Sequence, residues 1–312
     1  MAENNHPSLM SRIIEANLRL AGIKHRTTFQ SYMKKLKQDG PVYPPVYMYN
    51  KYDIHFNTFR GRKVWRISSK NASCERHILY FHGGAYVVNF TMPHWLYMGT
   101  LAERLNARVI APDYPLAPEH HVKDVFDMIV PLYQKVLKDS GASNLTLMGD
   151  SAGGGMALAL AQVLREKRIE QPAQIMLLSP WLDVTMSNPL ISQVDKKDAI
   201  LNVRGLIDSG KQYAGDLEPR DPRVSPLYGS MAGLAPVTVF IGTHDVLLPD
   251  CRRLKIRAEA AGNKISYYEY KGMLHDGMLY PIPEAKDIRD KIVKILQCSG
   301  EENNKKKEED GK

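Results

Sequence analysis

Cysteine is scarce in this sequence, and long hydrophobic runs are absent. Its 312 residues include three cysteines, Cys74, Cys251 and Cys298, with no C-x-x-C pair among them, which argues against a disulfide framework or a thiolate zinc site. No apolar run approaches the roughly 18 residues of a membrane span. The N-terminal segment has charges inside its apolar pattern and no signal-peptide core. We therefore expect a cytoplasmic protein with no stable membrane insertion.

The positive charge is concentrated at one end of the chain. The net charge is +8, but residues 1–70 hold 13 Lys and Arg against four Asp and Glu, so the remainder is close to neutral. A basic protein raises nucleic acid as a partner. Because the surplus is confined to one end and no nucleic-acid-binding motif accompanies it, we expect no nucleic-acid partner. One hypothesis is that this basic segment, which includes Lys34, Lys35 and Lys37, attracts anionic substrates.

Hydrophobic residues make up 44% of the chain, enough for a sizeable core, and they follow two alternating patterns. Short apolar runs typical of buried strands occupy residues 77–81, 107–112, 144–149, 174–179, 237–242 and 264–270. Helical patterns lie between most of them, at 95–106, 121–138, 151–167, 248–261 and 284–297. This alternation predicts an α/β fold whose mainly parallel sheet is covered by helices on both faces.

A β-hairpin is predicted before the alternation begins. The segments VYMYNKYDIHF and KVWRISS have strand-like composition and are separated around Gly61. In the first segment, Tyr47 and Tyr49 alternate as one face of a strand does. We interpret these tyrosines as ordinary strand packing rather than as the lining of an acyl pocket.

Three regions depart from the alternation and set the expected domain boundaries. The N-terminal region contains a helical pattern at 9–21 with Ser8 as its N-cap. A long polar insertion follows the fourth apolar run, where such excursions build binding surfaces. The last residues are of low complexity, which is typical of disorder. We therefore expect an N-terminal helical part at 1–45 and an α/β domain at 46–298. The domain contains the insertion at about 183–226, and a disordered tail follows it at 299–312.

The segment Gly149-Asp150-Ser151-Ala152-Gly153 lies between a predicted strand and a predicted helix. A tight strand-to-helix turn forces its serine into a strained conformation and leaves room only for small residues two positions before and after it. Gly149 and Gly153 meet that requirement. The turn would lift the Ser151 hydroxyl above the sheet at a helix N-terminus, where developing negative charge is favoured. The alternative is a glycine-rich helix start with a capping serine.

A nucleophilic serine also needs donors for the oxyanion that develops in acyl transfer. The strand at 77–81 runs directly into His82-Gly83-Gly84. Glycines after a strand let backbone N–H groups turn inward and approach a substrate closely. Together with the N–H of Ala152, they predict an oxyanion hole, although an ordinary strand-exit turn is the alternative for this segment alone.

The hydroxyl further needs a base, and the base needs an orienting acid. In this type of sheet the order along the chain is nucleophile, acid, histidine, each on a loop after a strand. Asp245 follows the run at 237–242, and His275 follows the run at 264–270. Asp250 is the alternative acid and His244 is the alternative base, but neither position fits this order as well.

Glu119, His120, His121 and Asp124 are residue types that can bind a metal ion, and they lie close together in the sequence. Neither an H-E-x-x-H helix nor a third spaced ligand accompanies these residues. We therefore expect no metal and no cofactor.

Taken together, these motifs resemble those of the hormone-sensitive-lipase-like esterases (bacterial family IV) of the α/β-hydrolase superfamily. The resemblance runs from about Tyr43 to Gln297. Besides GDSAGG and HGG, it includes DYPLAPEH at 113–120, similar to the family's D-Y-R-L-A-P-E-H, and SPWLD at 179–183, similar to S-P-W-x-D. Ala85 replaces the third glycine of H-G-G-G, which keeps the N–H, and Pro115 replaces an arginine.

The resemblance implies a serine carboxylesterase that acts on small, short-chain acyl esters and has no cofactor. It assigns catalysis to Ser151, Asp245 and His275, and the oxyanion hole to Gly83, Gly84 and Ala152, with Ala85 able to share that role. A helical cap built from the N-terminal residues and the insertion is also implied, and a homodimer is one option. The rivals are an amidase or deacetylase with the same triad and a non-catalytic ligand-binding protein of the same fold.

Overall fold

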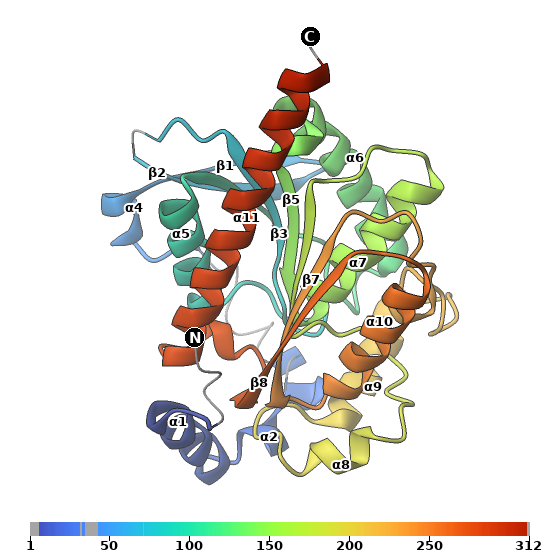
Figure 1. Ribbon diagram of the computed structural model, residues 1–312. Coiled ribbons are helices and arrows are strands. Elements are labelled where there is room, and N and C mark those ends of the chain that lie inside the picture. The colour runs from blue at the N-terminus through green and yellow to red at the C-terminus, as the bar shows by residue number, and fades with distance from the viewer. Residues whose placement is uncertain (1–5, 32, 35–42, 71, 311–312) are drawn as a thin grey trace.

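The computed structural model describes residues 6–31, 33–34, 43–70 and 72–310, and its centre is an eight-stranded sheet (Figure 1). The strands are β1 (Tyr52–Phe59), β2 (Arg62–Ser69), β3 (Arg76–Phe81), β4 (Ala107–Pro112), β5 (Leu145–Asp150), β6 (Gln174–Leu178), β7 (Val237–His244) and β8 (Ile265–Leu274). Their order is β1-β2-β4-β3-β5-β6-β7-β8. β2 pairs antiparallel with both neighbours, and all other pairs are parallel. The predicted mainly parallel sheet is confirmed.

Helices cover both faces of this sheet (Figure 1). They are α5 (Met92–Leu105) and α11 (Pro283–Asp310) on one face, and α6 (Val122–Ser140), α7 (Ser151–Glu166) and α10 (Leu248–Ala260) on the other. In β3, Ile78 and Tyr80 belong to the core under α5 and α11, whereas Leu79 and Phe81 belong to the opposite core. Because both faces are buried, the strands are continuous apolar runs instead of alternating ones.

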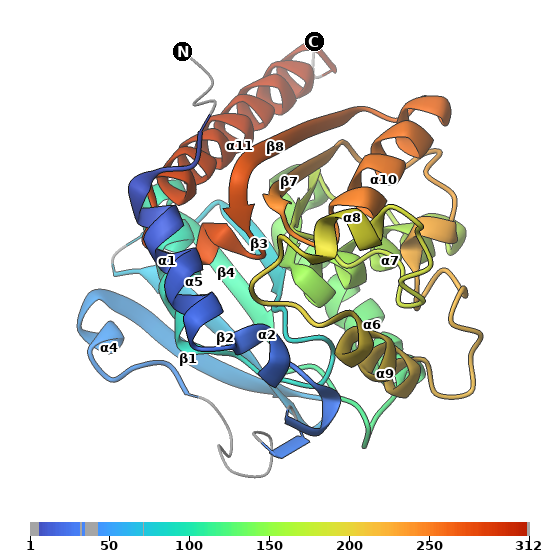
Figure 2. The ribbon, with the colours of Figure 1, turned by 90° about the horizontal axis from the view of Figure 1, so that it is seen from below.

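The N-terminal helices lie beside the insertion at one end of the sheet (Figures 1 and 2). These are α1 (Leu9–Leu20) and α2 (Ile23–Arg26), with α8 (Ile191–Asp195) and α9 (Val203–Ala214) in the insertion. The Ser8 side chain accepts a hydrogen bond from Ser11 N–H, as expected of an N-cap. Lys24 Nζ lies 2.8 Å from Asp195 Oδ1, and Thr27 Oγ1 donates to the Ile200 carbonyl at 2.7 Å. Short 3-10 helices complete the elements at η1 (Ala142–Asn144), η2 (Pro226–Tyr228) and η3 (Gly277–Leu279).

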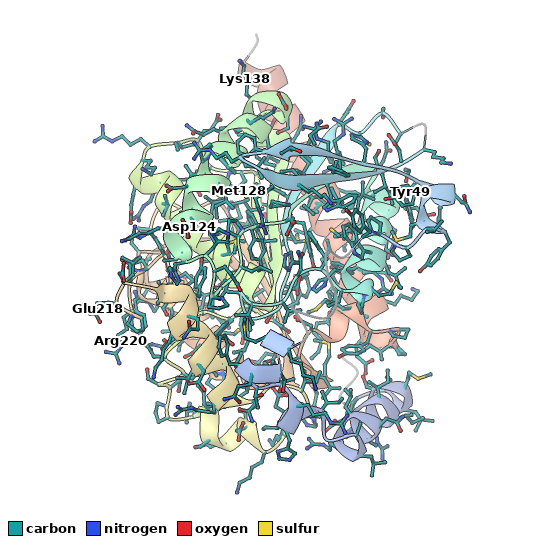
Figure 3. The ribbon with its side chains drawn as sticks, turned by 180° about the vertical axis from the view of Figure 1, so that it is seen from behind. Tyr49, Asp124, Met128, Lys138, Glu218 and Arg220 are labelled. Atoms are coloured by element: carbon teal, nitrogen blue, oxygen red, sulfur yellow. The ribbon has the colours of Figure 1, made fainter. Side chains whose placement is uncertain are left out.

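The predicted hairpin is present, but its first strand is shorter than expected. β1 begins at Tyr52, and the residues before it form α4 (Met48–Lys51). A helical turn after Pro45 lets Met48 reach the core, where its side chain is 1% exposed. Tyr47 and Tyr49 are exposed, and Tyr49 lies at the outer edge of the molecule (Figure 3). The interpretation of these tyrosines as one face of a strand is therefore wrong.

The C-terminal segment also differs from the expectation. A disordered tail was expected at 299–312, but residues 299–310 continue α11 as helix, and residues 311–312 lie outside the described part of the chain. The segment is rich in Glu and Lys, which have high helix propensity and can extend a helix that tertiary packing has already nucleated. Although α11 has 28 residues, none of the helices in the described part of the chain is long and apolar enough to cross a membrane.

Candidate active site

Ser151 lies on the sharp turn that joins β5 to α7. Its backbone has φ +50°, a left-handed conformation that is strained for a residue with a side chain. A Cβ added at Gly149 would lie 2.3 Å from the Gly153 carbonyl oxygen, and one added at Gly153 would lie 2.0 Å from the Phe81 carbonyl oxygen. Both contacts are with backbone, which cannot move aside. The predicted geometry of the turn, with glycine required on each side, is confirmed.

The structure brings Ser151 together with His275 and Asp245. His275 Nε2 lies 2.9 Å from Ser151 Oγ, and His275 Nδ1 lies 2.9 Å from Asp245 Oδ2. All three side chains are buried. Asp245 follows β7 and is held in place because its Oδ1 accepts the N–H of Leu247 at 2.9 Å. The imidazole thus has a hydroxyl at one nitrogen and a carboxylate at the other, the arrangement that activates a serine nucleophile.

The two alternatives considered for acid and base lie elsewhere. Asp250 is in α10, where its Oδ1 accepts a hydrogen bond from Asn188 at 2.8 Å. His244 Nδ1 lies 3.0 Å from Glu15 Oε2 of α1. Within the described part of the chain, Asp250 has no hydrogen bond to His275, and His244 has none to Ser151.

Asp276 is a second carboxylate at the same histidine, and the sequence did not indicate it. Its Oδ2 lies 3.1 Å from His275 Nε2. Burial alone would lower the pKa of His275, but Asp245 and Asp276 outweigh it and raise that pKa well above its ordinary value. Burial also raises the pKa of Asp276 to about 7, with His275 opposing the shift and Asp150 and Asp245 adding to it.

Asp198 links the insertion to the Asp245 loop, and it too was missed. Its Oδ1 accepts the N–H groups of Ile200 and Leu201, and its Oδ2 accepts the N–H of Val246 at 2.8 Å. The side chain is fully buried. Burial and the nearby Asp245 raise the pKa of Asp198 to about 6. The residue after the acid is therefore anchored by a carboxylate from the insertion.

The oxyanion loop, which we define as residues 82–85 after β3, differs from the prediction at one residue. The N–H of Gly83 donates to Asp150 Oδ2 at 2.9 Å, which removes it from the set of available donors. Gly84 has φ +112°, and a Cβ there would lie 2.4 Å from the Val88 carbonyl oxygen, so glycine is required. Among the described residues, the N–H groups of Gly84, Ala85 and Ala152 have no hydrogen-bond acceptor. The available donors therefore come from Gly84, Ala85 and Ala152.

Asp150 is the residue that holds the oxyanion loop against the serine turn. Besides Gly83 N–H, its carboxylate accepts a hydrogen bond from Tyr80 OH and lies 3.1 Å from His94 Nε2. Burial would raise the pKa of Asp150, but His94 and Tyr80 outweigh burial and lower it. Its place inside the Gly149–Gly153 segment was the signal that could have identified it, since a charged residue in so tight a turn needs partners.

His82 packs inside the loop instead of facing the serine. Its ring stacks on Tyr114, with centroids 4.3 Å apart, and its Nδ1 lies 2.6 Å from the Gly83 carbonyl oxygen. Tyr114 OH donates to the His82 carbonyl at 2.7 Å. Burial lowers the pKa of His82 to about 3, so the ring is neutral at neutral pH. The segment containing Tyr114 thereby supports the oxyanion loop.

The sequence around Glu119 does not form a metal site. His121 Nδ1 lies 2.8 Å from the Gln212 carbonyl oxygen, and His120 Nδ1 lies 3.7 Å from Asp124 Oδ2. Over residues 6–31, 33–34, 43–70 and 72–310, no group of three or more His, Cys, Asp or Glu could hold a metal ion.

Comparisons with known proteins identify relatives of this chain. Residues 78–279 match a family described as having the α/β hydrolase fold. The chain is 36% identical over 231 residues to an esterase from Acinetobacter venetianus, covering 73% of this chain and 75% of that one. It is 30% identical over 201 residues to an acetyl-hydrolase from Streptomyces hygroscopicus, covering 64% and 67%. A crystal structure of an esterase from the bacterial hormone-sensitive lipase family has a TM-score of 0.82 at 27% identity, covering 96% and 99%.

The chain therefore belongs to the α/β hydrolases. Within them it is a hormone-sensitive-lipase-like esterase of bacterial family IV, and its chemistry is the hydrolysis of carboxylic esters by a serine hydrolase.

Proposed function

We propose that the enzyme hydrolyses short-chain acyl esters through a covalent acyl-enzyme formed on Ser151. The observation that carries the proposal is the continuous hydrogen-bonded chain of Ser151 Oγ, His275 and Asp245, with 2.9 Å at each contact. His275 takes the hydroxyl proton as Ser151 attacks the ester carbonyl. The C–O bond then breaks, and the alcohol leaves with that proton. Water, activated by His275, releases the carboxylic acid in the second half of the reaction.

The oxyanion of each tetrahedral intermediate would be held by backbone N–H groups. Gly84, Ala85 and Ala152 provide donors without other acceptors among the described residues. Each such donor contributes about 3 kcal/mol to transition-state stabilisation in a water-excluded site. The α7 N-terminus, at which Ala152 lies, adds a favourable dipole.

A helical cap over the site supports the preference for small esters. The N-terminal helices contact the insertion through Lys24 and Asp195 and through Thr27 and Ile200. Tyr213 of the insertion stacks on Tyr86, which directly follows the oxyanion loop, with ring centroids 3.6 Å apart. The relative that is named an acetyl-hydrolase also points to a short acyl group. We therefore assign residues 1–45, of which 1–5, 32 and 35–42 lie outside the described part of the chain, and about 183–226 to the cap.

A panel of p-nitrophenyl esters of increasing acyl length tests this function, with Ser151→Ala measured beside the wild type. We expect the highest kcat/KM for the shortest acyl chains and loss of nearly all turnover in Ser151→Ala. Mass spectrometry of the wild type quenched during turnover is expected to show acyl adducts on the peptide containing Ser151. Equal turnover by the two proteins would contradict the mechanism.

The rival functions give different results in the same experiment. An amidase or deacetylase with the same triad would hydrolyse matched p-nitroanilides as well as p-nitrophenyl esters, whereas the proposed esterase should leave the anilides intact, because preference for the leaving group is decided by contacts outside the triad. A non-catalytic binding protein would hydrolyse neither substrate.

A further inference from the structure

Asp276 places a carboxylate at the nitrogen of His275 that must exchange a proton with Ser151. Its Oδ2 is 3.1 Å from His275 Nε2, while Ser151 Oγ is 2.9 Å from the same atom. The second oxygen, Oδ1, is buried without a hydrogen-bond partner among the described residues. The backbone at Asp276 has φ +50°, and its N–H donates to Ser179 Oγ at 3.3 Å. The left-handed backbone of Asp276 and its hydrogen bond to Ser179, from the loop after β6, thus hold the carboxyl group against the imidazole.

The two protonation states of His275 interact with this carboxylate in opposite ways. When Nδ1–H donates to Asp245, the neutral ring has only a lone pair at Nε2, and that lone pair accepts the Ser151 hydroxyl. An ionised Asp276 oxygen facing the same lone pair has no proton to share, so the contact is repulsive. Once Nε2 is protonated, its N–H donates to Asp276 and the contact becomes a charge-assisted hydrogen bond. Asp276 therefore favours the protonated ring.

A protonated Asp276 would also withhold the base. Its O–H would donate to the lone pair at Nε2, which Ser151 needs for its own hydroxyl. In both arrangements a proton remains between Nε2 and Asp276, and it must leave before His275 can act as a base. The activity of the site is thereby linked to the removal of one shared proton.

Other titratable groups surround this pair from each neighbouring element. The nearby carboxylates are Asp150 of β5, Asp198 of the insertion and Asp245 after β7. The nearby tyrosine hydroxyls are those of Tyr80 in β3, Tyr97 in α5 and Tyr280 after η3. The nearby carboxylates also favour a protonated His275, but among the described residues only Asp276 shares the Nε2 contact with Ser151.

We propose that Asp276 is a positioning residue that holds the protonated Nε2 of His275 and so sets the pH range in which the hydrolase is active. The inference rests on the proposed role of His275 as the base for Ser151. Removal of the carboxylate leaves Nε2 with Ser151 as its partner. His275 is then neutral, and competent as a base, at lower pH than in the wild type.

The acid limb of the pH profile of kcat/KM tests the proposal. We expect the half-maximal point for p-nitrophenyl acetate, measured over about pH 5 to 9, to move down by about one unit in Asp276→Asn. Asp276→Gly should move it in the same direction, and both substitutions suit the left-handed backbone at this position. Asp250→Asn is the matched control, because Asp250 is another buried carboxylic acid whose pKa burial raises to about 6.

A titration that does not depend on turnover separates this inference from the proposed function. The imidazole signals of His275, assigned by their loss in His275→Gln, are followed by NMR against pH in the wild type and in Asp276→Asn. We expect the pKa of His275 to be lower in the variant. The proposal would be overturned if neither Asp276 variant moved the acid limb and Asp276→Asn left the titration of His275 unchanged. It would also be overturned if Asp250→Asn moved the acid limb by the same amount. A wild type that hydrolyses no ester would overturn the proposed function, while the titration would still decide the role of Asp276.

Discussion

His82 and His275 are both buried at the same end of the sheet, yet their surroundings give them opposite properties. His82 lies against Phe90 and Tyr114, and burial lowers its pKa to about 3. His275 lies between carboxylates, which outweigh burial and raise its pKa. Burial therefore does not decide what a histidine can do. The neighbouring charges decide it, and only the loop of His275 can carry a proton at neutral pH.

The two loops accordingly use carboxylates for different purposes. Asp150 accepts the N–H of Gly83 and fixes the backbone of the His82 loop. Asp245 accepts from the ring of His275 itself. The carboxylate at the His82 loop fixes the backbone that presents N–H donors, whereas the carboxylate at the His275 loop supports proton transfer. This contrast predicts a graded series of effects.

The largest effect is expected from Asp245→Asn. An amide cannot stabilise the imidazolium and permits the wrong tautomer of His275, so kcat should fall by roughly 10⁴-fold. The measurement is kcat for p-nitrophenyl acetate at a pH on the wild-type plateau. Asp250→Asn should remain close to the wild type. An active Asp245→Asn together with an inactive Asp250→Asn would contradict the role of Asp245 as the acid.

A smaller loss is expected on the side of the His82 loop. Asp150→Asn removes the charge that faces His94 and weakens the contact that positions Gly83, so kcat should fall by about 10²-fold. Tyr80→Phe removes a different hydrogen bond to the same carboxylate and leaves the loop contact in place. Its kcat should fall less. Equal activity of Asp150→Asn and the wild type would contradict the role of Asp150 in shaping the loop.

The two histidines should affect the pH dependence of stability with opposite signs. The pKa of His82 is lower in the folded state, so its contribution is complete above about pH 6.5 and is lost as the pH falls towards its folded value. From pH 6.5 to 5 this loss is about 2 kcal/mol. Urea unfolding at these two pH values should show that His82→Phe loses less stability than the wild type.

The pKa of His275 is higher in the folded state, so its contribution is present below about pH 6.5 and is lost as the pH rises through the folded value. Urea unfolding at pH 6.5 and at about pH 9 should therefore show that His275→Gln loses less stability than the wild type as the pH rises. Parallel behaviour of the two variants over the same pH range would contradict the contrast.

The smallest effect concerns the basic N-terminal segment. Lys34 is exposed, whereas Lys35 and Lys37 lie outside the described residues. An exposed charge is screened by salt, so Lys34→Gln should reduce kcat/KM for an anionic ester by about twofold or less at low ionic strength. The neutral ester of the same acyl length is the control. An equal change for both esters would leave no role for steering.

Much of the fold was predictable because its pattern is local. The apolar runs and the helical patterns between them predict the strands from β3 to β8 within a few residues. The start of the hairpin was less predictable, because Met48 lies in a helical turn and packs against residues of α5, which comes later in the chain. The helix at the C-terminus follows from propensity and from the preceding turns of α11, which low complexity alone does not reveal.

The candidate site divides in the same way. Ser151, Asp245 and His275 were predictable because each follows a strand of a parallel sheet, and the carboxyl ends of such strands meet at one edge. The directions in which individual N–H and carboxylate groups point were not predictable. Gly83 N–H turns to Asp150, and Asp276 turns back to His275, because of backbone angles that several loops determine together.

The sequence by itself determined the α/β fold, the strained serine turn and the order of nucleophile, acid and base, because these depend on hydrophobic period, on glycine and on position after a strand. Only the tertiary structure decided which N–H groups remain free for an oxyanion and that His275 has a second carboxylate at Nε2. Hydrogen bonds and charges act over a few ångströms, and residues far apart in the chain come within that distance only when the loops pack together.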